Sequence, residues 1–343
     1  MKDLISTIQH NCNIADAQSA GDYTLCIYLL KMRELFRWEM QSDFGVSLDN
    51  EAIGNWITER EQIWLDLEQN EYQPLTINGK SFLPFENNAI NDALSSHHLI
   101  YSGGIGQHEN PHFFIAELLH KTEMDDYCIY IAGKELARDL TAPPAMSIDK
   151  SIFIRRESLK RMIWERLEEW RWKRGTGAMS KALEHYDFDN HLYHALDKMT
   201  DHEADVLLHH EIGEIKAGRL LGETWHKMLF SLPRSAGEFM ARAVRDHLAD
   251  CHSTLPMLLR ENRHASLHFF FGNFKGMRKE IYPDLYQAYE SWQITQDDTE
   301  LKASIARGQL HWRDQALNIL KIYQSNPENC SSQIAELISD SKL

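Results

Sequence analysis

The chain has 343 residues, 43% of them hydrophobic and 25% charged, which is enough to build a sizeable folded core. Its formal charge of −15 repels phosphate backbones, so we expect no nucleic-acid binding by the chain as a whole. The N-terminal stretch turns polar too early for a secretory leader, and no run approaches the roughly 20 apolar residues that cross a bilayer. The five scattered cysteines lack a Cys-x-x-Cys pair. We therefore predict a cytoplasmic protein without disulfides or membrane insertion.

The first half of the chain predicts two amphipathic helices followed by a small hairpin. Apolar residues recur on a helical repeat over residues 22–41 and again over residues 52–69. Between residues 72 and 110, frequent Pro and Gly interrupt any long helix, and Asn78-Gly79 predicts a hairpin turn. A helix over residues 111–121, with Pro in its first turn, and a short strand over residues 127–131 complete this half.

The paired prolines Pro143 and Pro144 predict a domain boundary, because two prolines cannot continue a helix and favour an extended connector. We expect an N-terminal helical region with the hairpin over residues 1–142 and a C-terminal His/Glu-rich helical domain over residues 146–343. Apolar periodicity predicts helices near 150–173, 179–185, 200–230, 235–261, 263–276, 283–294, 300–321 and 330–340. The fold class is therefore mainly α, a multi-helix bundle or orthogonal array with a minor β-hairpin in the N-terminal half.

Two charged features of the sequence have structural interpretations. The segment from Ser151 to Gly175 holds eight Lys or Arg and four Glu interleaved with tryptophans, a pattern that can serve an anionic partner. An apolar stripe through the same segment favours instead an ordinary helix with a solvated basic face. Glu34 lies on the apolar side of its helix, where we predict a buried ion pair with Arg33, Arg37 or Arg138.

Histidine is concentrated in one quarter of the chain, since 11 of the 18 fall between His185 and His268. A helical repeat places Glu203, His210 and Glu214 on one face, and later helices add Asp250, His264 and His268. Imidazole and carboxylate ligands without thiolate favour iron or manganese over zinc. The candidate metal ligands are therefore Glu203, His210, Glu214, Asp250, His264 and His268.

Two hypotheses of function follow, and neither identifies a substrate or partner. The first is a helical protein with a non-heme iron or manganese site and oxidative chemistry. The second is a non-catalytic interaction or regulatory protein whose His and Glu side chains form a buried polar network. Pairing of His210 and Glu214 with arginines such as Arg219 or Arg245 would favour the second. The sequence leaves open whether the chain is an enzyme and whether it forms a homo-oligomer.

Two resemblances to known families accompany these hypotheses. His210-x-x-x-Glu214 and His264-x-x-x-His268 resemble part of the ligand spacing of hemerythrin-like HHE proteins, although the expected later His-x-x-x-x-Asp is absent. The whole chain resembles an uncharacterised bacterial family of helical proteins. The stretches that carry this second resemblance are Tyr28–Glu34, Arg37–Glu39, Pro111–Phe114, Glu135–Leu140 and His210–Glu214. It implies a helical fold and transfers no catalytic residue.

Overall fold

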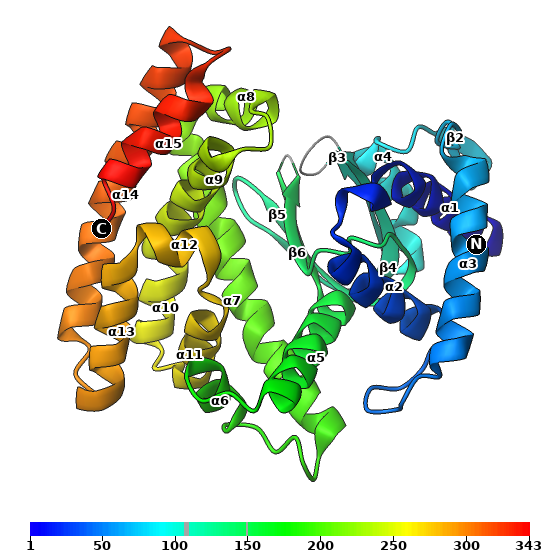
Figure 1. Ribbon diagram of the computed structural model, residues 1–343. Helices are drawn as coiled ribbons and strands as arrows, with labels where there is room; N and C mark the ends of the chain where they lie inside the picture. The colour runs from blue at the N-terminus through cyan, green and yellow to red at the C-terminus, as the bar shows by residue number, and fades with distance from the viewer. Residues whose placement is uncertain (106–109, 149) are drawn as a thin grey trace. The chain divides into compact units, whose positions relative to one another are not determined.

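The computed structural model describes residues 1–105, 110–148 and 150–343, and more than half of these are helical, as predicted. The chain forms two compact units, Met1–Trp164 and Glu165–Leu343, which we describe separately. Figure 1 colours the chain from its N-terminus to its C-terminus and labels the elements of both units. Helix α5 (Arg156–Lys173) begins in the first unit and ends in the second.

The N-terminal unit contains the two predicted helices and the predicted hairpin. Its helices are α1 (Lys2–Ser19), α2 (Leu25–Glu39), α3 (Asn50–Leu67) and α4 (Asn87–Leu94), with short 3₁₀ turns at Ala20–Asp22 and Ser95–His97. Strands β1 (Leu75–Ile77) and β2 (Lys80–Phe82) pair in antiparallel fashion. Asn78 and Gly79 between them both have positive φ, the conformation that a tight hairpin turn requires.

A five-stranded mixed sheet forms the middle of this unit, and it corrects the expectation that the hairpin is the main β element. Its strands are β3 (Leu99–Ile105), β4 (Pro111–Glu123), β5 (Cys128–Arg138), β6 (Ala145–Ile148) and β7 (Ser151–Arg155). They lie in the order β3-β4-β5-β7-β6, and only the pair of β5 and β7 is parallel. The predicted helix over residues 111–121 is wrong, because this segment is strand β4. Pro143 and Pro144, at the predicted boundary, lie between β5 and β6.

The sheet is covered on both faces where β4 begins. Phe113 and Ile115 pack with Ile8 and Cys12 of α1, whereas Phe114 on the opposite face packs with Phe153 and Ala132. Figure 1 shows α1 and α2 beside the sheet in this unit. Because both faces are buried, four consecutive residues of β4 are fully buried.

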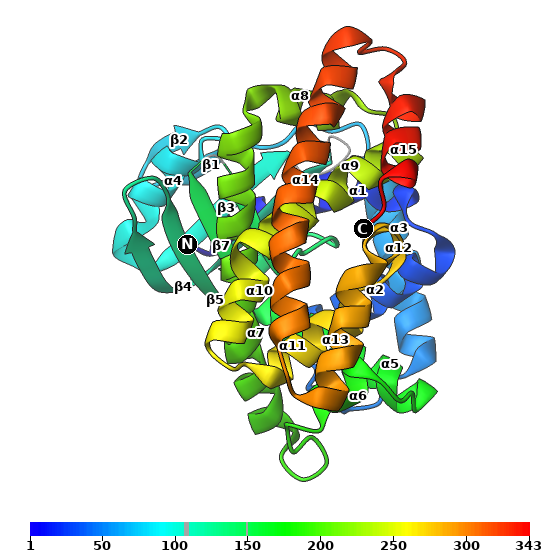
Figure 2. The same ribbon diagram turned by 90° about the vertical axis from the view of Figure 1, so that its left-hand side faces the viewer.

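All elements of Glu165–Leu343 are helical, and most agree with the predicted segments. They are α6 (Ala178–Leu183), α7 (Leu192–Leu221), α8 (Glu223–Ser231), α9 (Ala236–Ala249), α10 (Leu255–Arg260), α11 (His264–Asn273), α12 (Gly276–Ile281), α13 (Pro283–Thr295), α14 (Thr299–Ser325) and α15 (Cys330–Asp340). Helix α14 lies beside α9, α13 and α15 (Figure 2). A large apolar core that includes Trp225, Trp312 and Tyr289 joins these helices.

A π-helical turn at Asp250–Thr254 joins α9 to α10. Pro256 follows it in the first turn of α10. Because proline has no N–H and its ring crowds the carbonyl four residues earlier, a wider turn is expected here. This turn carries Asp250, one of the candidate site residues.

Two further expectations concern the membrane and the cysteines. None of the helices among the described residues has the length and apolar character of a membrane span. All five cysteines are free thiols, in agreement with the prediction of no disulfides.

Candidate functional site

Helix α7 supplies three of the six predicted ligand residues, and α9 packs against it at very short range. Gly213 permits this approach, because a Cβ there would lie 2.5 Å from the carbonyl oxygen of Ala249. The next residue after Ala249 is Asp250, in the π-helical turn. The crossing therefore brings Asp250 to the level of His210 and Glu214 on α7.

His210 lies between two carboxylates. Its Nδ1 is 2.8 Å from Oδ1 of Asp250, and its Nε2 is 3.4 Å from Oε1 of Glu214. Glu214 also accepts from Arg245, at 2.8 Å, and Asp250 forms an ion pair with Arg278 of α12. We call this group the His210 network, and its members are His210, Glu214, Arg245, Asp246, Asp250 and Arg278.

The network balances three cations against three carboxylates. Burial lowers the pKa of His210, but Asp250 and Glu214 outweigh this effect and raise the pKa well above 6.5. Burial alone would raise the pKa of Asp250, but Arg278 and His210 lower it to about 2. The pKa of Glu214 is lowered to about 2 in the same way, because Arg245 and His210 outweigh the effect of burial. His210 is therefore expected to be an imidazolium at neutral pH.

A metal ion needs a ligand atom with a free lone pair, and the network offers few. Ligand atoms of His210, Glu214 and Asp246 lie within 4.8 Å of one another, the sort of spacing that a cation could bridge. However, an imidazolium has no lone pair to donate, and Arg245 already occupies the space between Glu214 and Asp246. The pairing of Glu214 with Arg245 is the arrangement that favours a structural role for these residues.

The remaining three predicted ligands have other partners. Glu203 is buried and accepts a hydrogen bond of 2.7 Å from Ser266 of α11. His264 meets the ring of Trp292 edge to face. His268 Nδ1 is 2.7 Å from the hydroxyl of Tyr289, and its ring stacks on His185. The six residues thus separate into the His210 network, a Glu203–Ser266 pair and an aromatic cluster around His264 and His268.

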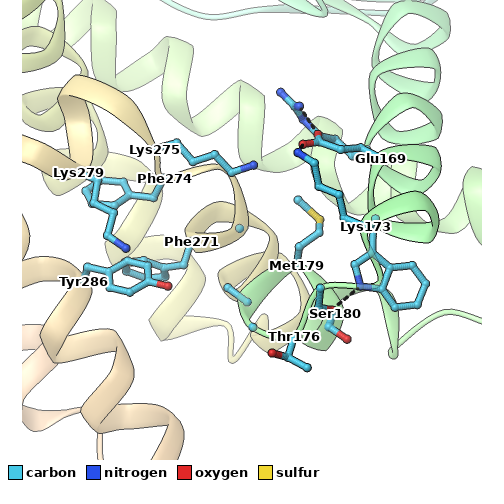
Figure 3. A pocket seen from close by; sticks show the side chains of 16 residues that line it. Glu169, Lys173, Thr176, Met179, Ser180, Phe271, Phe274, Lys275, Lys279 and Tyr286 are labelled. Atoms are coloured by element: carbon cyan, nitrogen blue, oxygen red, sulfur yellow. Dashed lines mark hydrogen bonds and ion pairs between the residues drawn. The ribbon is translucent and has the colours of Figure 1, made fainter.

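A pocket that the sequence did not predict lies elsewhere in the C-terminal unit. It has a volume of about 300 Å³ and is framed by the end of α5, the start of α6, and residues of α11, α12 and α13. Figure 3 shows Lys275 reaching into it from one side and Lys173, paired with Glu169, from the other. Phe271, Phe274 and Tyr286 line one wall. We call this the lysine pocket.

The lysine pocket carries a formal charge of +3, from Arg166, Lys173, Lys275 and Lys279 against Glu169 alone. Glu169 is already engaged, because it accepts from Arg166 at 2.9 Å and from Lys173 at 2.7 Å. Its hydrogen bond with Lys173 lowers its pKa to about 2, which keeps it ionised. Lys279 lies 3.4 Å from the centre of the Tyr286 ring, a cation–π contact. The pocket therefore combines cations with an aromatic wall.

One signal in the sequence pointed towards this pocket. The basic segment Ser151–Gly175 supplies Arg166, Lys173 and Trp170 to its lining. The apolar stripe predicted for that segment is also present, because Leu159, Ile163 and Leu167 are fully buried. The second half of the lining comes from residues 271–286, and the sequence alone gave no reason to join the two segments.

Two family models match the chain. One is the N-terminal domain of a family of unknown function (DUF6866), over residues 3–155, and the other is the C-terminal domain of the same family, over residues 160–341. The chain belongs to this family. The resemblance to an uncharacterised family is thus confirmed, whereas neither match is to hemerythrin-like proteins. No curated protein and no solved structure matches the chain.

Proposed function

We propose that this member of DUF6866 is a non-catalytic binding protein whose lysine pocket takes a small organic anion with an aromatic ring. The observation that carries the proposal is the charge of the pocket, +3 in a chain of −15. Such a local excess attracts anions against the overall field of the protein. The aromatic wall of Phe271, Phe274 and Tyr286 would hold the flat part of the ligand.

The His210 network supports the non-catalytic part of the proposal. Its three cations and three carboxylates already pair with one another, so the network has the composition of a structural polar core. Groups that perform acid–base chemistry at neutral pH usually have a pKa near 7. In the network, by contrast, the pKa of Glu214 and of Asp250 is about 2.

Calorimetric titration with phenyl phosphate, inorganic phosphate and phenol tests the proposal. Phenyl phosphate is expected to bind at least about tenfold more tightly than either fragment, because only it meets both the lysines and the aromatic wall. The double variant Lys275→Gln with Lys279→Gln should lose this preference. Lys216→Gln with Lys227→Gln is the matched control, since both lysines lie outside the pocket. Equal binding of the three probes would contradict the proposal.

The metal hypothesis has one observation in its favour, the spacing of His210, Glu214 and Asp246. An iron or manganese ion there would have to displace Arg245 and deprotonate His210. Metal analysis of protein purified without a His-tag tests it directly. Stoichiometric metal in the parent protein, lost in the double variant His210→Ala with Glu214→Ala while helical content is kept, would favour an oxidative metalloprotein over the binding protein proposed above.

A further inference from the structure

The N-terminal unit contains a second cavity, larger than the lysine pocket and lined by buried arginines. Its volume is about 690 Å³. Arg37 of α2, Arg60 of α3 and Arg161 of α5 line it together with Lys134, and each of the three arginines is less than 9% exposed. We call this the arginine cavity. Arginine is rarely buried, and each of its nitrogens then needs an acceptor, so the hydrogen bonds of these three side chains must be accounted for atom by atom.

Arg37 is the most deeply buried of the three, with no exposed surface. Its Nε lies 3.3 Å from Oε2 of Glu34, which confirms the ion pair predicted for Glu34. Its Nη1 donates to the backbone carbonyls of Asp43 and Val46, at 2.8 and 3.3 Å. Its Nη2 has no hydrogen-bond partner. One guanidinium edge is therefore fixed in place while the other nitrogen is left as an unused donor.

The other arginines around the cavity also keep unused donors. Arg60 pairs with Glu39, and Arg161 pairs with Glu157 at 2.6 Å, yet the Nε of each arginine has no acceptor. Because those two carboxylates are engaged, they do not satisfy the free nitrogen of Arg37. A buried N–H group without an acceptor destabilises the fold, and the penalty is larger when the group is charged.

Two more arginines stand behind the cavity, on the sheet. Arg155 on β7 donates through Nε to Glu135, at 2.9 Å, but both of its Nη atoms lack acceptors. Arg138 on β5 lies 3.9 Å from Glu135 and has a free Nη1. Burial lowers the pKa of Arg138, and the charges of Arg161 and Arg155 lower it further. One carboxylate, Glu135, therefore serves two buried guanidinium groups.

The acidic residues nearby supply fewer unused acceptors than the arginines have unused donors, although Glu135 Oε2 and Asp16 Oδ2 also lack hydrogen-bond partners. Both carboxylate oxygens of Asp139 already accept hydrogen bonds, from the backbone N–H groups of Phe113 and Ala142. Asp16 Oδ1 already accepts from the backbone N–H of Leu140, and burial and Asp139 raise the pKa of this carboxyl well above 3.8. The donors around the cavity thus exceed the acceptors that the described residues provide.

From this surplus of donors we propose that the arginine cavity binds a small molecule through a carboxylate or phosphate group, with Arg37 Nη2 as its central donor. Oxygens of either group match the fork of a guanidinium, and the hydrogen bonds would be charge-assisted. The size of the cavity is typical of small-molecule sites. Trp38 and Phe44 in the lining offer contacts for the rest of the ligand. This site is independent of the lysine pocket, since it uses residues of the other unit.

Thermal unfolding of the full chain, with titrated inorganic phosphate or succinate, tests the proposal and separates the two ligand chemistries. Sodium chloride at the same ionic strength is the reference. Relative to it, one of the two anions is expected to raise Tm by a few degrees, with an effect that saturates as its concentration rises. A response to phosphate alone assigns a phosphorylated ligand, and a response to succinate alone assigns a carboxylate. Equal effects of both anions and of sodium chloride would overturn the proposal.

Arg37→Lys is the decisive variant, because it keeps a positive charge beside Glu34 but removes the free Nη2. It is expected to weaken binding of the effective anion about tenfold. Arg33→Lys, in the same helix but outside the cavity, is the matched control and should bind as the parent does.

If Arg37→Lys fails to fold, Lys134→Gln serves instead, since Lys134 is exposed and lines the cavity. It should weaken binding about threefold. Unchanged binding in the folded variant would refute the site.

Discussion

At the residue scale, His210 is the side chain whose protonation separates the two hypotheses of function. Asp250 and Glu214 face its two ring nitrogens, and both favour the charged imidazole. The folded-state pKa is raised, so the stability that His210 contributes is fully present below about pH 6.5 and is lost as pH rises through the folded pKa. A metal ligand would show the opposite preference, for the neutral ring.

We predict that His210 stays protonated at pH 7.5 in the folded protein. Nitrogen chemical shifts of the histidine rings by NMR can test this, with His210→Gln identifying the resonance. Two protonated nitrogens on the His210 ring are expected. A neutral ring with one bare nitrogen would contradict the charge network.

Glu203 gives a prediction of the opposite kind, for a buried carboxyl. Burial raises its pKa to about 7, against smaller opposing effects of Ser266 and Arg263. Because the fold prefers the neutral acid, this contribution to stability is full below pH 4.5 and is lost as pH rises through about 7. The loss amounts to about 3 kcal/mol.

Glu203→Gln should therefore stabilise the protein at pH 8 much more than at pH 4.5. Urea unfolding of parent and variant at both pH values measures the difference. Glu71→Gln, at an exposed position outside the helices, is the control for removal of one carboxylate. A Glu203→Gln variant that gains equally at both pH values would show that Glu203 does not titrate in this range.

At the element scale, the crossing of α7 and α9 depends on Gly213. An added methyl group would lie 2.5 Å from a backbone oxygen, which cannot move without shifting α9. We predict that Gly213→Ala lowers the free energy of unfolding by about 1–3 kcal/mol and disturbs the His210 network. Gly218→Ala, on the same helix with its nearest neighbour at 3.6 Å, should be neutral or stabilising by up to about 1 kcal/mol. Chemical denaturation measures both, and equal effects would contradict the argument.

The helices of the second half were predictable because each keeps its apolar side chains on one face, as α9 does with Met240, Val244 and Leu248. Strand β4 was not, for two reasons. Its run Phe113–Ala116 is buried on both faces, which removes the alternation that marks a half-exposed strand. Irregular pairing with β5 after Ile115 then disturbs the remaining pattern.

Periodicity also predicted only part of the candidate site. Periodicity placed His210 and Glu214 on one face of α7, and the structure agrees. It could not say which helix faces them, because that depends on packing between distant segments. Asp250 reaches His210, while His264 and His268 on α11 turn towards Trp292 and Tyr289. The sequence predicted the ion pair of Glu34 with Arg37, but it did not predict the arginine cavity, because donors without acceptors can be recognised only in three dimensions.

At the scale of the whole molecule, negative charge is spread over both units, yet each contains a cationic hollow. Residues 1–164 hold 24 acidic and 14 basic residues, a formal charge of −10, and residues 165–343 hold 27 and 22, a charge of −5. The lysine pocket, with a formal charge of +3, reverses this sign, whereas five basic and four acidic residues line the arginine cavity and give it a formal charge of +1. Reversals of this kind select small anions, because a large polyanion would also meet the surrounding acidic surface.

Helix α5 contributes residues to both units, and this limits how the chain can be divided into separately expressed fragments. Its first turns belong to the N-terminal unit, where Ser158 donates to Glu135 and Trp164 packs near Phe44. Its last turns carry Arg166, Glu169 and Lys173 of the lysine pocket. Dividing the chain at any one position within or beside α5 therefore removes part of this helix from one of the two fragments. Fragments 1–173 and 156–343 overlap, so both contain the shared helix. We expect this pair to give more protein that unfolds cooperatively on heating than the pair 1–155 and 156–343. If fragment 1–173 unfolds no more cooperatively than fragment 1–155, the first unit does not need this helix.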